Sequence, residues 1–242
     1  MRRARDLLVP LELDATTLPA LARQAGAYEP EDGGSAPRSY PGYPRTALPA
    51  VSARWLGSLE RALAGRRSVR DVEPALPAAR ALARLFRFGH GALASGGRGP
   101  APSAGGLQAV ELFPVVLAPG WLAPGAYHYD RAGHHLSRVS DTDRARWSEL
   151  VPSLADVPAA PLVLVLAGDA ARVEAKYGAR AAKLLLLEAG HVMQDLCLVA
   201  HGAGLAVVPC GGFLEEPIAR ALALPRGDAV LYAAACGAVG PR

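Results

Sequence analysis

The sequence predicts an α+β domain of three layers (α/β/α), with helices packed on a central sheet. Segments with helical periodicity alternate with short apolar runs typical of strands, but without the strict βαβ repeat of a parallel sheet. The longest helical pattern, residues 176–204, is apolar over so wide an arc that it needs burial on more than one side. A chain of 242 residues can bury such a core.

The first fifty residues differ in composition from the rest. They are rich in Pro, Gly and Tyr, and each Pro biases the residue before it away from helix. We therefore expect residues 1–50 to form an extended arm or long loop, and residues 51–242 to form the folded domain.

Helices are expected where an apolar repeat of helical spacing lies between capping and breaking residues. Ser52 can cap the first helix, which stops at Gly65, and a second spans residues 77–88. The long pattern is ended by Gly202, so Lys176–Tyr177 is expected at the N-terminal edge of one long helix. Shorter helices are expected around residues 143–151 and over 215–222.

Strands are expected at residues 110–117, 126–129, 135–139, 161–168, 205–208 and 229–240. Each is a short run rich in apolar residues and bounded by turn residues. The second and third predict a hairpin. The run at 161–168 is apolar almost throughout, which is typical of a central strand.

Charge and hydropathy exclude several classes of protein. The net charge of +4 allows an anionic ligand, but the basic residues are scattered, without the dense stripe of a nucleic-acid binder. Lys183, Glu188 and Asp195 interrupt the long helix and would be costly in lipid, so no membrane span is expected. The N-terminus lacks the apolar core of a signal peptide. We expect a cytoplasmic protein with no nucleic-acid or membrane partner.

Neither the cysteines nor the histidines predict a metal site. Cys197, Cys210 and Cys236 form no CxxC pair, so inert buried thiols are expected. Glu188 and His191 form an ExxH on one helical face, but the second motif of a di-metal bundle is absent. The three histidines of the predicted hairpin lack the cysteines or carboxylates that would complete a zinc site.

A basic turn, RRSVR, follows the helix-ending Gly65. Arg66, Arg67, Ser68 and Arg70 place three guanidinium groups and a hydroxyl within five residues. Arginine matches phosphate oxygens in bidentate fashion, so the turn could bind a phosphate. The alternative is a solvated basic turn.

The loop over residues 98–108 could approach a ligand. Gly105 and Gly106 permit close backbone approach, while Ser103 and Gln108 offer hydrogen-bond donors. The alternative is a flexible linker.

A second glycine pair, Gly211 and Gly212, lies between a predicted strand and a predicted helix. Backbone N–H groups at a helix N-terminus suit an electron-rich ligand atom. The alternative is a tight structural turn.

Lys176 and Tyr177 are candidate proton-transfer residues. Either side chain can act as a general acid or base only where its surroundings lower a pKa that is ordinarily about 10. The alternative is a pair of surface residues.

Taken in order, these motifs resemble those of the flavin-dependent azoline dehydrogenases, or SagB-type oxidases, of the nitroreductase superfamily. The resembling segments are SYPGYPRTALP (39–49), RRSVR (66–70), PSAGGL (102–107), EL (111–112), YHYD (127–130), KYGAR (176–180), LEAGH (187–191), GGF (211–213) and LY (231–232). Each motif alone is weak, but the ordered set extends over about four fifths of the chain and is specific.

The resemblance implies a nitroreductase-like fold with a mixed sheet, built as an intertwined homodimer with FMN at the subunit interface. It implies that Arg66, Arg67, Ser68 and Arg70 hold the phosphate and ribityl chain. It further implies that Pro102, Ser103 and Ala104 line the isoalloxazine ring from the partner subunit, and that the backbone of Gly211 and Gly212 faces flavin N5. One departure concerns residues 108–110, which read QAV where many relatives have a Tyr-Pro pair.

The activity implied is oxidation of peptide thiazolines or oxazolines to thiazoles or oxazoles in peptide natural-product biosynthesis. Lys176 or Tyr177 is expected to take the Cα proton while a hydride equivalent leaves Cβ for the flavin, which oxygen then reoxidises. An azoline-containing precursor peptide and a cyclodehydratase are the expected partners, because the chain has no large N-terminal extension for leader recognition. The alternatives are an NAD(P)H-dependent nitro-, quinone or ene-reductase, and a non-catalytic flavin-binding scaffold subunit.

Overall fold

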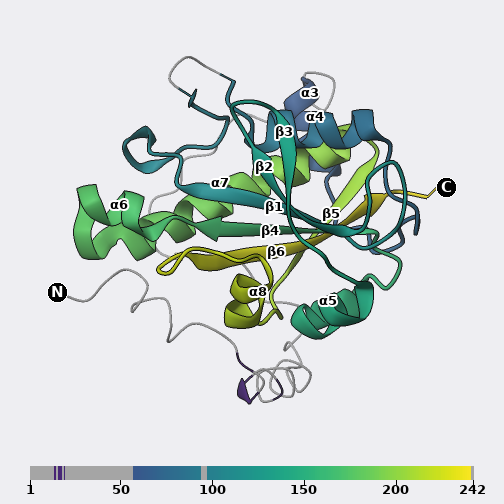
Figure 1. The fold of residues 1–242 in the computed structure, drawn as a ribbon. Helices are drawn as coiled ribbons and strands as arrows, with labels where there is room; N and C mark the ends of the chain where they lie inside the picture. Colours follow the sequence, from purple (N-terminus) through teal and green to yellow (C-terminus); the bar gives the residue numbers. More distant parts are fainter. Residues whose placement is uncertain (1–13, 15, 18, 20–56, 94–96, 241–242) are drawn as a thin grey trace, which may run out of the picture.

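The computed structural model describes residues 57–93 and 97–240, together with the isolated residues 14, 16, 17 and 19. The predicted arm and the predicted helix cap at Ser52 lie outside these ranges, so both stay predictions. The described part forms one sheet with helices on both of its faces (Figure 1).

The sheet has six strands in the order β3-β2-β1-β4-β6-β5. The strands are β1 Val110–Val116, β2 Gly125–Asp130, β3 His135–Ser140, β4 Leu162–Gly168, β5 Leu205–Cys210 and β6 Ala229–Ala238. Every pairing among the described strands is antiparallel, so the expectation of a mixed sheet is wrong for this part of the chain. The predicted hairpin is confirmed as β2–β3.

Strand β4 is the interior strand that its apolar sequence predicts. Its side chains alternate between two cores: Leu162, Leu164 and Leu166 face one layer of helices, while Val163 and Val165 face the other. Both faces of β4 are buried, which explains a continuous apolar run where a half-exposed strand would alternate.

The helices divide between the two faces of the sheet. Helices α4 (Ala79–His90) and α7 (Ala181–Gly202) cover one face, and α5 (Arg144–Leu150) and α8 (Glu215–Ala221) cover the other (Figure 1). Asp143 starts α5 by accepting a hydrogen bond from the N–H of Arg146. The predicted three-layer fold is confirmed.

The prediction of a single helix over residues 176–204 is wrong, because the helix is interrupted at Gly178. Helix α6 (Ala170–Tyr177) ends there, a 3-10 turn η7 (Gly178–Arg180) follows, and α7 begins at Ala181. Gly178 has a φ of 55°, which favours glycine and ends the helix. Lys176 and Tyr177 therefore lie at the C-terminal end of α6 and not at the start of the long helix.

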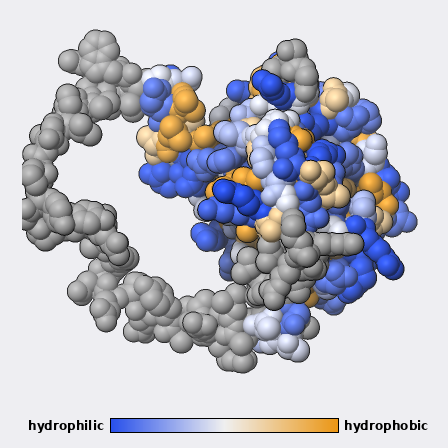
Figure 2. Space-filling view, turned by 90° about the vertical axis from the view of Figure 1, so that its left-hand side faces the viewer, coloured by the Kyte–Doolittle hydropathy of each residue, from blue (hydrophilic) through white to orange (hydrophobic). Residues whose placement is uncertain are grey.

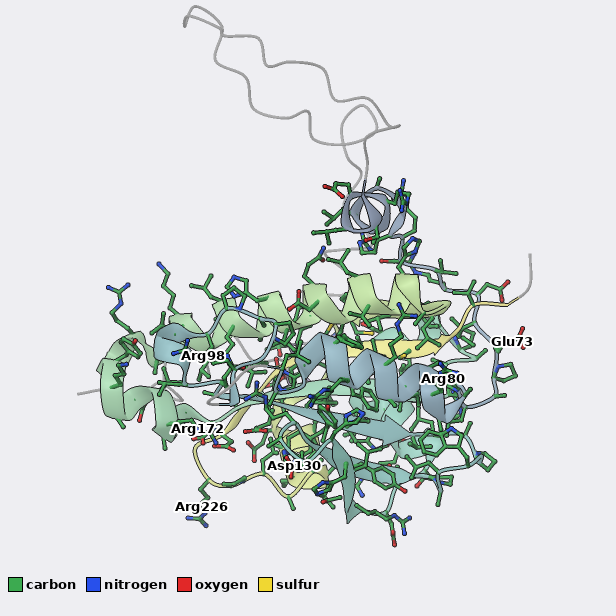
Figure 3. The ribbon with its side chains drawn as sticks, turned by 90° about the horizontal axis from the view of Figure 1, so that it is seen from above. Glu73, Arg80, Arg98, Asp130, Arg172 and Arg226 are labelled. Atoms are coloured by element: carbon green, nitrogen blue, oxygen red, sulfur yellow. The ribbon has the colours of Figure 1, made fainter. Side chains whose placement is uncertain are left out.

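Helix α3 (Ser58–Gly65) lies on the outer side of α7 and has no buried residue (Figure 3). Two leucines of α3 and two of α7 leave much of their surface exposed to solvent. The exposed fractions are 60% for Leu59, 51% for Leu63, 41% for Leu186 and 49% for Leu187. In the view onto the α6 end, small hydrophobic areas lie among hydrophilic residues (Figure 2). Ala170–Gly202 is long and apolar enough to cross a membrane by composition alone, but α7 packs ten of its residues into the core of the described fold.

Candidate functional site

The basic turn begins where α3 ends. The N–H of Arg66 donates to Ala62 O at 2.8 Å and closes the helix. Arg67 folds back and donates to Ala64 O at 2.9 Å. Arg67, Ser68 and Arg70 are exposed and Arg66 is half-buried, so the turn presents positive charge and a hydroxyl at the surface.

A cavity of about 200 Å³ opens beside this turn. It is lined by Gly65, Arg67, Val69, Cys197, His201, Gly204, Leu205, Val207 and Val239. A Cβ on Gly65 would lie 2.7 Å from His201 Nε2, so the glycine lets the C-terminal end of α7 reach the turn. The cavity therefore joins a basic loop to the C-terminal end of α7.

The predicted Gly211–Gly212 turn follows β5. The N–H of Gly212 donates to Ser153 Oγ at 2.9 Å, which ties the turn to the 3-10 helix η6 (Pro152–Asp156). The position of a Cβ on Gly211 lies in open space. Burial raises the pKa of the Cys210 thiol at the end of β5, and the positive charge of Arg70 acts against that rise. The basic turn therefore interacts electrostatically with the end of β5.

The second group of predicted site residues meets elsewhere, at the loop that contains the 3-10 turn η5 (Ala104–Gly106). Gly105 has a φ of 60°, and a Cβ built on it would lie 2.6 Å from both Lys176 Nζ and Tyr177 Oη. Lys176 Nζ is also 5.4 Å from the centre of the Tyr177 ring. The structure thus brings the Lys-Tyr pair against the loop that the resemblance assigns to the flavin ring.

Polar side chains of α7 hold this loop in place. A ring nitrogen of His191, Nδ1, lies 3.1 Å from Pro102 O. The carboxylate of Glu188, which is 4% exposed, accepts the N–H of Val110 at 3.1 Å, where the loop becomes β1. The ExxH pattern therefore supports the loop, and among the described residues no cluster of His, Cys, Asp or Glu could hold a metal ion.

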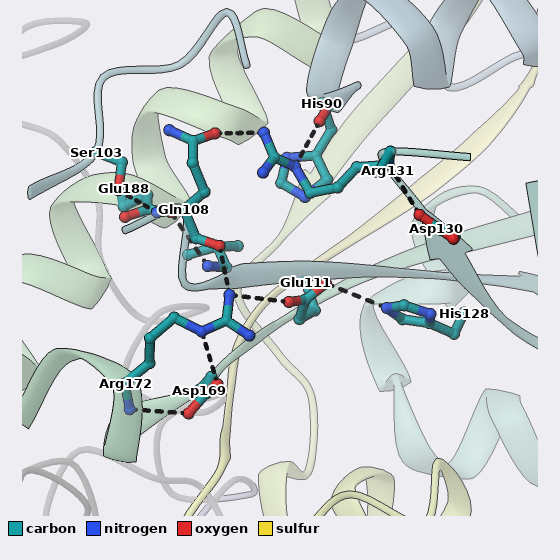
Figure 4. A network of polar contacts seen from close by, with 12 residues as sticks. His90, Ser103, Gln108, Glu111, His128, Asp130, Arg131, Asp169, Arg172 and Glu188 are labelled. Atoms are coloured by element: carbon teal, nitrogen blue, oxygen red, sulfur yellow. Dashed lines mark hydrogen bonds and ion pairs between the residues drawn. The ribbon is translucent and has the colours of Figure 1, made fainter. Parts of the chain in front are cut away.

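An ionic network lies beneath the loop (Figure 4). Arg172 on α6 contacts Asp169 at 2.9 Å and Glu111 at 3.5 Å, and Glu111 also contacts His128 at 3.1 Å. Burial raises the pKa of Glu111, but His128 and Arg172 outweigh it and hold that pKa below its ordinary value. Asp228 differs, because burial and the charges of its acidic neighbours raise its pKa to about 6.

Sequence reasoning did not find Arg172. It belongs to no motif, and the only local signal is Asp169, a residue type that often caps helices, which accepts the N–H of Arg172 at the start of α6. The three histidines of the hairpin, which lie close together in sequence, each contact a different partner. His128 pairs with Glu111, His134 contacts Tyr129 Oη at 2.7 Å, and His135 lies 3.5 Å from Asp130.

The three cysteines are buried free thiols, as predicted. Burial raises the pKa of Cys197 to about 11 and that of Cys236 to about 12, so both thiols stay protonated near neutral pH. Their nucleophilic form is suppressed, and they serve as small apolar core residues.

The two groups of predicted site residues contact different parts of α7. The loop contacts His191, whereas the basic turn approaches Cys197 and His201. His201 lies ten residues after His191, which corresponds to about 15 Å of helix. Within one chain, the phosphate-type half and the Lys-Tyr half of the predicted site are therefore separate.

Comparison with known proteins agrees with this fold. A model of the nitroreductase family matches residues 63–238. A protein named as a candidate nitroreductase of Methanocaldococcus jannaschii is 29% identical over 165 residues, which are 68% of this chain and 83% of that protein.

Two solved structures extend the comparison. A candidate nitroreductase from Ralstonia eutropha is 22% identical with a TM-score of 0.66, and the match covers 81% of this chain and 89% of that one. A chain from the E. coli microcin synthetase McbBCD complex with truncated pro-MccB17 bound is 18% identical with a TM-score of 0.70, and the match covers 97% of both chains. At these identities the two likenesses show the fold.

Proposed function

The chain belongs to the nitroreductase family, and we propose that it is an FMN-dependent azoline dehydrogenase that oxidises thiazoline or oxazoline rings of a peptide to thiazoles or oxazoles. The observation that carries this proposal is the contact of Lys176 and Tyr177 with Gly105. A proton-accepting pair lies against a loop whose glycine leaves room for close approach.

The residues present fit a flavin phosphate. Arg66, Arg67, Ser68 and Arg70 supply the cationic and hydroxyl donors that a phosphate needs, next to an open cavity. Within the loop, Pro102 is exposed, while Ser103 and Ala104 are half-buried, so this segment can present a surface to an aromatic ring. The assignment of Gly211 to flavin N5 is supported by the open space at its Cβ position.

A second observation favours proton transfer at residue 176. The chain has 26 basic residues, and only Lys176 and Lys183 among them are lysines. An amine can exchange its proton, whereas a guanidinium stays protonated in proteins. Lys176 therefore differs in chemistry from nearly all the other cations of this chain.

The proposed mechanism divides two hydrogens between the protein and its cofactor. Bound FMN supplies the acceptor for the hydride that leaves Cβ of the azoline. Lys176 or Tyr177 takes the Cα proton, and the other residue of the pair orients it. Loss of one proton and one hydride converts the azoline to the aromatic azole.

We also propose that the protein is a homodimer, because the two halves of the site contact α7 about 15 Å apart. A two-fold axis across α7 would place the basic turn of one chain near the loop of its partner. The exposed Leu59, Leu63, Leu186 and Leu187 provide apolar surface for that contact. The microcin synthetase chain of similar fold occurs in a complex with truncated pro-MccB17 bound, which favours a peptide substrate and partner proteins for this chain. A cyclodehydratase is the partner that the sequence resemblance implies.

An anaerobic half-reaction tests this function. The purified protein would be loaded with FMN, and its visible band followed after addition of a thiazoline peptide to one sample and NADPH to another. We expect bleaching by the thiazoline, with a mass loss of two hydrogens in the peptide. Bleaching by NADPH alone would indicate a nitro-, quinone or ene-reductase, and absence of a flavin band would indicate that the chain does not bind FMN.

A further inference from the structure

Gln108, at the end of the loop, has an unusual backbone conformation for its residue type. Its φ is 52°, in the left-handed region that favours glycine, and its side chain is buried with 9% of the residue exposed. A residue with a Cβ keeps such a conformation only where surrounding contacts hold it. At Gln108 those contacts are hydrogen bonds with other loop residues, with Arg131 and with Arg172.

The side chain of Gln108 closes the loop onto its own beginning. Figure 4 shows its contact with Arg131. Its Oε1 accepts the N–H of Gly99 at 3.0 Å and a hydrogen bond from the Arg131 guanidinium. Its Nε2 donates to Ala101 O at 3.4 Å. The buried amide is therefore satisfied at both ends, which fixes the span from residue 99 to residue 108.

The backbone of Gln108 connects the loop to α6. Its N–H donates to Ser103 Oγ at 2.7 Å, and its carbonyl accepts from Arg172 Nη1 at 2.9 Å. Arg172 lies one helical turn before Lys176, and its guanidinium also contacts Glu111 and Asp169. A continuous chain of contacts thus runs from Ser103 through Gln108 to the helix that carries the Lys-Tyr pair.

We propose that Gln108 is a positioning residue that sets the separation between the flavin-facing loop and the Lys-Tyr pair. This inference rests on the proposed function, because it assigns that separation a role in proton removal. A base must lie within roughly 2.6–3.2 Å of the proton that it takes. A displacement of about 1 Å can lower a rate about 100-fold, so the left-handed conformation at Gln108 serves the precision of the site.

Gln108→Gly tests the proposal, because glycine adopts the left-handed conformation without strain and the variant keeps both backbone hydrogen-bonding groups. We expect kcat for azoline oxidation to fall about ten-fold or more, with KM and FMN content changed less than about three-fold. Ala223→Gly is the matched control, since Ala223 has a φ of 51° at the end of α8, away from the loop. It should leave kcat unchanged.

Amide hydrogen exchange on the FMN-free protein provides a readout that does not depend on activity. In Gln108→Gly, exchange should rise about ten-fold over residues 99–107, where the side-chain hydrogen bonds are lost, and stay unchanged in β4. Unchanged exchange in the loop, or exchange raised equally in β4, would overturn the positioning role. If the wild-type protein does not oxidise azolines, the proposed function fails while the exchange result still reports whether Gln108 fixes the loop.

Discussion

The two parts of α7 that contact the predicted site residues are built differently. Near its C-terminal end, Arg67, Ser68 and Arg70 are exposed beside a cavity of about 200 Å³. Nearer its N-terminal end, the loop is held by hydrogen bonds to Glu188 and Gln108 and contacts Lys176 and Tyr177. We call the first the open end and the second, where the loop is held by hydrogen bonds, the braced end. The open end suits binding of an anionic group, and the braced end suits chemistry that needs fixed distances. In the proposed function, each end alone is half of the flavin site.

The largest expected effect of a substitution is at the braced end. Lys176→Ala combined with Tyr177→Phe should lower azoline oxidation by about 100-fold or more, because the proton acceptor is removed. FMN content should be kept, because the arginine turn is untouched. Single-turnover kinetics with an FMN absorbance spectrum measure both quantities. Lys183→Ala, which changes the other lysine, is the control, and full activity in the double variant would remove the assignment of the base.

At the open end, the expected effect is on binding. Arg66→Ala should weaken FMN retention by roughly 1.5–3 kcal/mol, the scale of a hydrogen bond to a charged group. Titration of the FMN-free protein with FMN, followed by flavin fluorescence, measures this change. Arg226→Ala removes a cation from an exposed turn outside the cavity lining and should bind FMN as the wild type does. Equal affinities for all three proteins would contradict the phosphate role.

A smaller effect is expected at Asp228, which lies beside the network of the braced end. Its pKa is raised to about 6, so folding favours its protonated form. The protonated Asp228 carboxyl therefore contributes to the free energy of unfolding below about pH 4, and this contribution is lost as the pH rises through about 6. Asn is neutral, as the protonated carboxyl is, so the free energy of unfolding of Asp228→Asn should be about 1 kcal/mol higher than that of the wild type at pH 8. This value allows for solvent screening of the half-buried group, and at pH 4 the two proteins should be nearly equal.

Denaturant unfolding at the two pH values checks this prediction. Asp141→Asn is the control, because Asp141 is an exposed residue that forms a surface ion pair with Arg138 at 2.9 Å. Its substitution should change the free energy of unfolding little. A destabilised Asp228→Asn at pH 8 would show that the carboxylate is favourable there, against the raised pKa.

Much of the fold could be predicted from the sequence, because its strongest signals are local. The apolar run at β4, the helix expected around residues 143–151 and the helix end expected at Gly202 all agree with the structure within a few residues. The break at Gly178 was missed, since helical periodicity continues across it and a single glycine is tolerated inside many helices. The antiparallel pairing depends on contacts distant in sequence, which periodicity does not contain.

In the candidate site too, features that are local in sequence could be predicted, and contacts between distant residues could not. The arginine turn and the Lys-Tyr pair are contiguous motifs, so the resemblance could propose them by residue number. The contact between Gly105 and Lys176 joins residues far apart in sequence, and Arg172 has no motif of its own. The role of Gln108 required its φ of 52°, which no sequence pattern reports.

The central claim is that the two ends of α7 from different chains form one site, and mixed dimers test it most directly. Arg66→Ala and the Lys176→Ala/Tyr177→Phe variant would be co-expressed with different tags, and the mixed dimer isolated. In a shared site, each mixed dimer has one site with both wild-type halves and one with both halves altered. The assay uses an FMN concentration that fills the wild-type sites and leaves the Arg66→Ala parent largely empty, so that both parents have little activity. The isolated mixed dimer should then show about half of the wild-type activity per dimer. Activity no higher than the mean of the two parent variants would contradict the shared site.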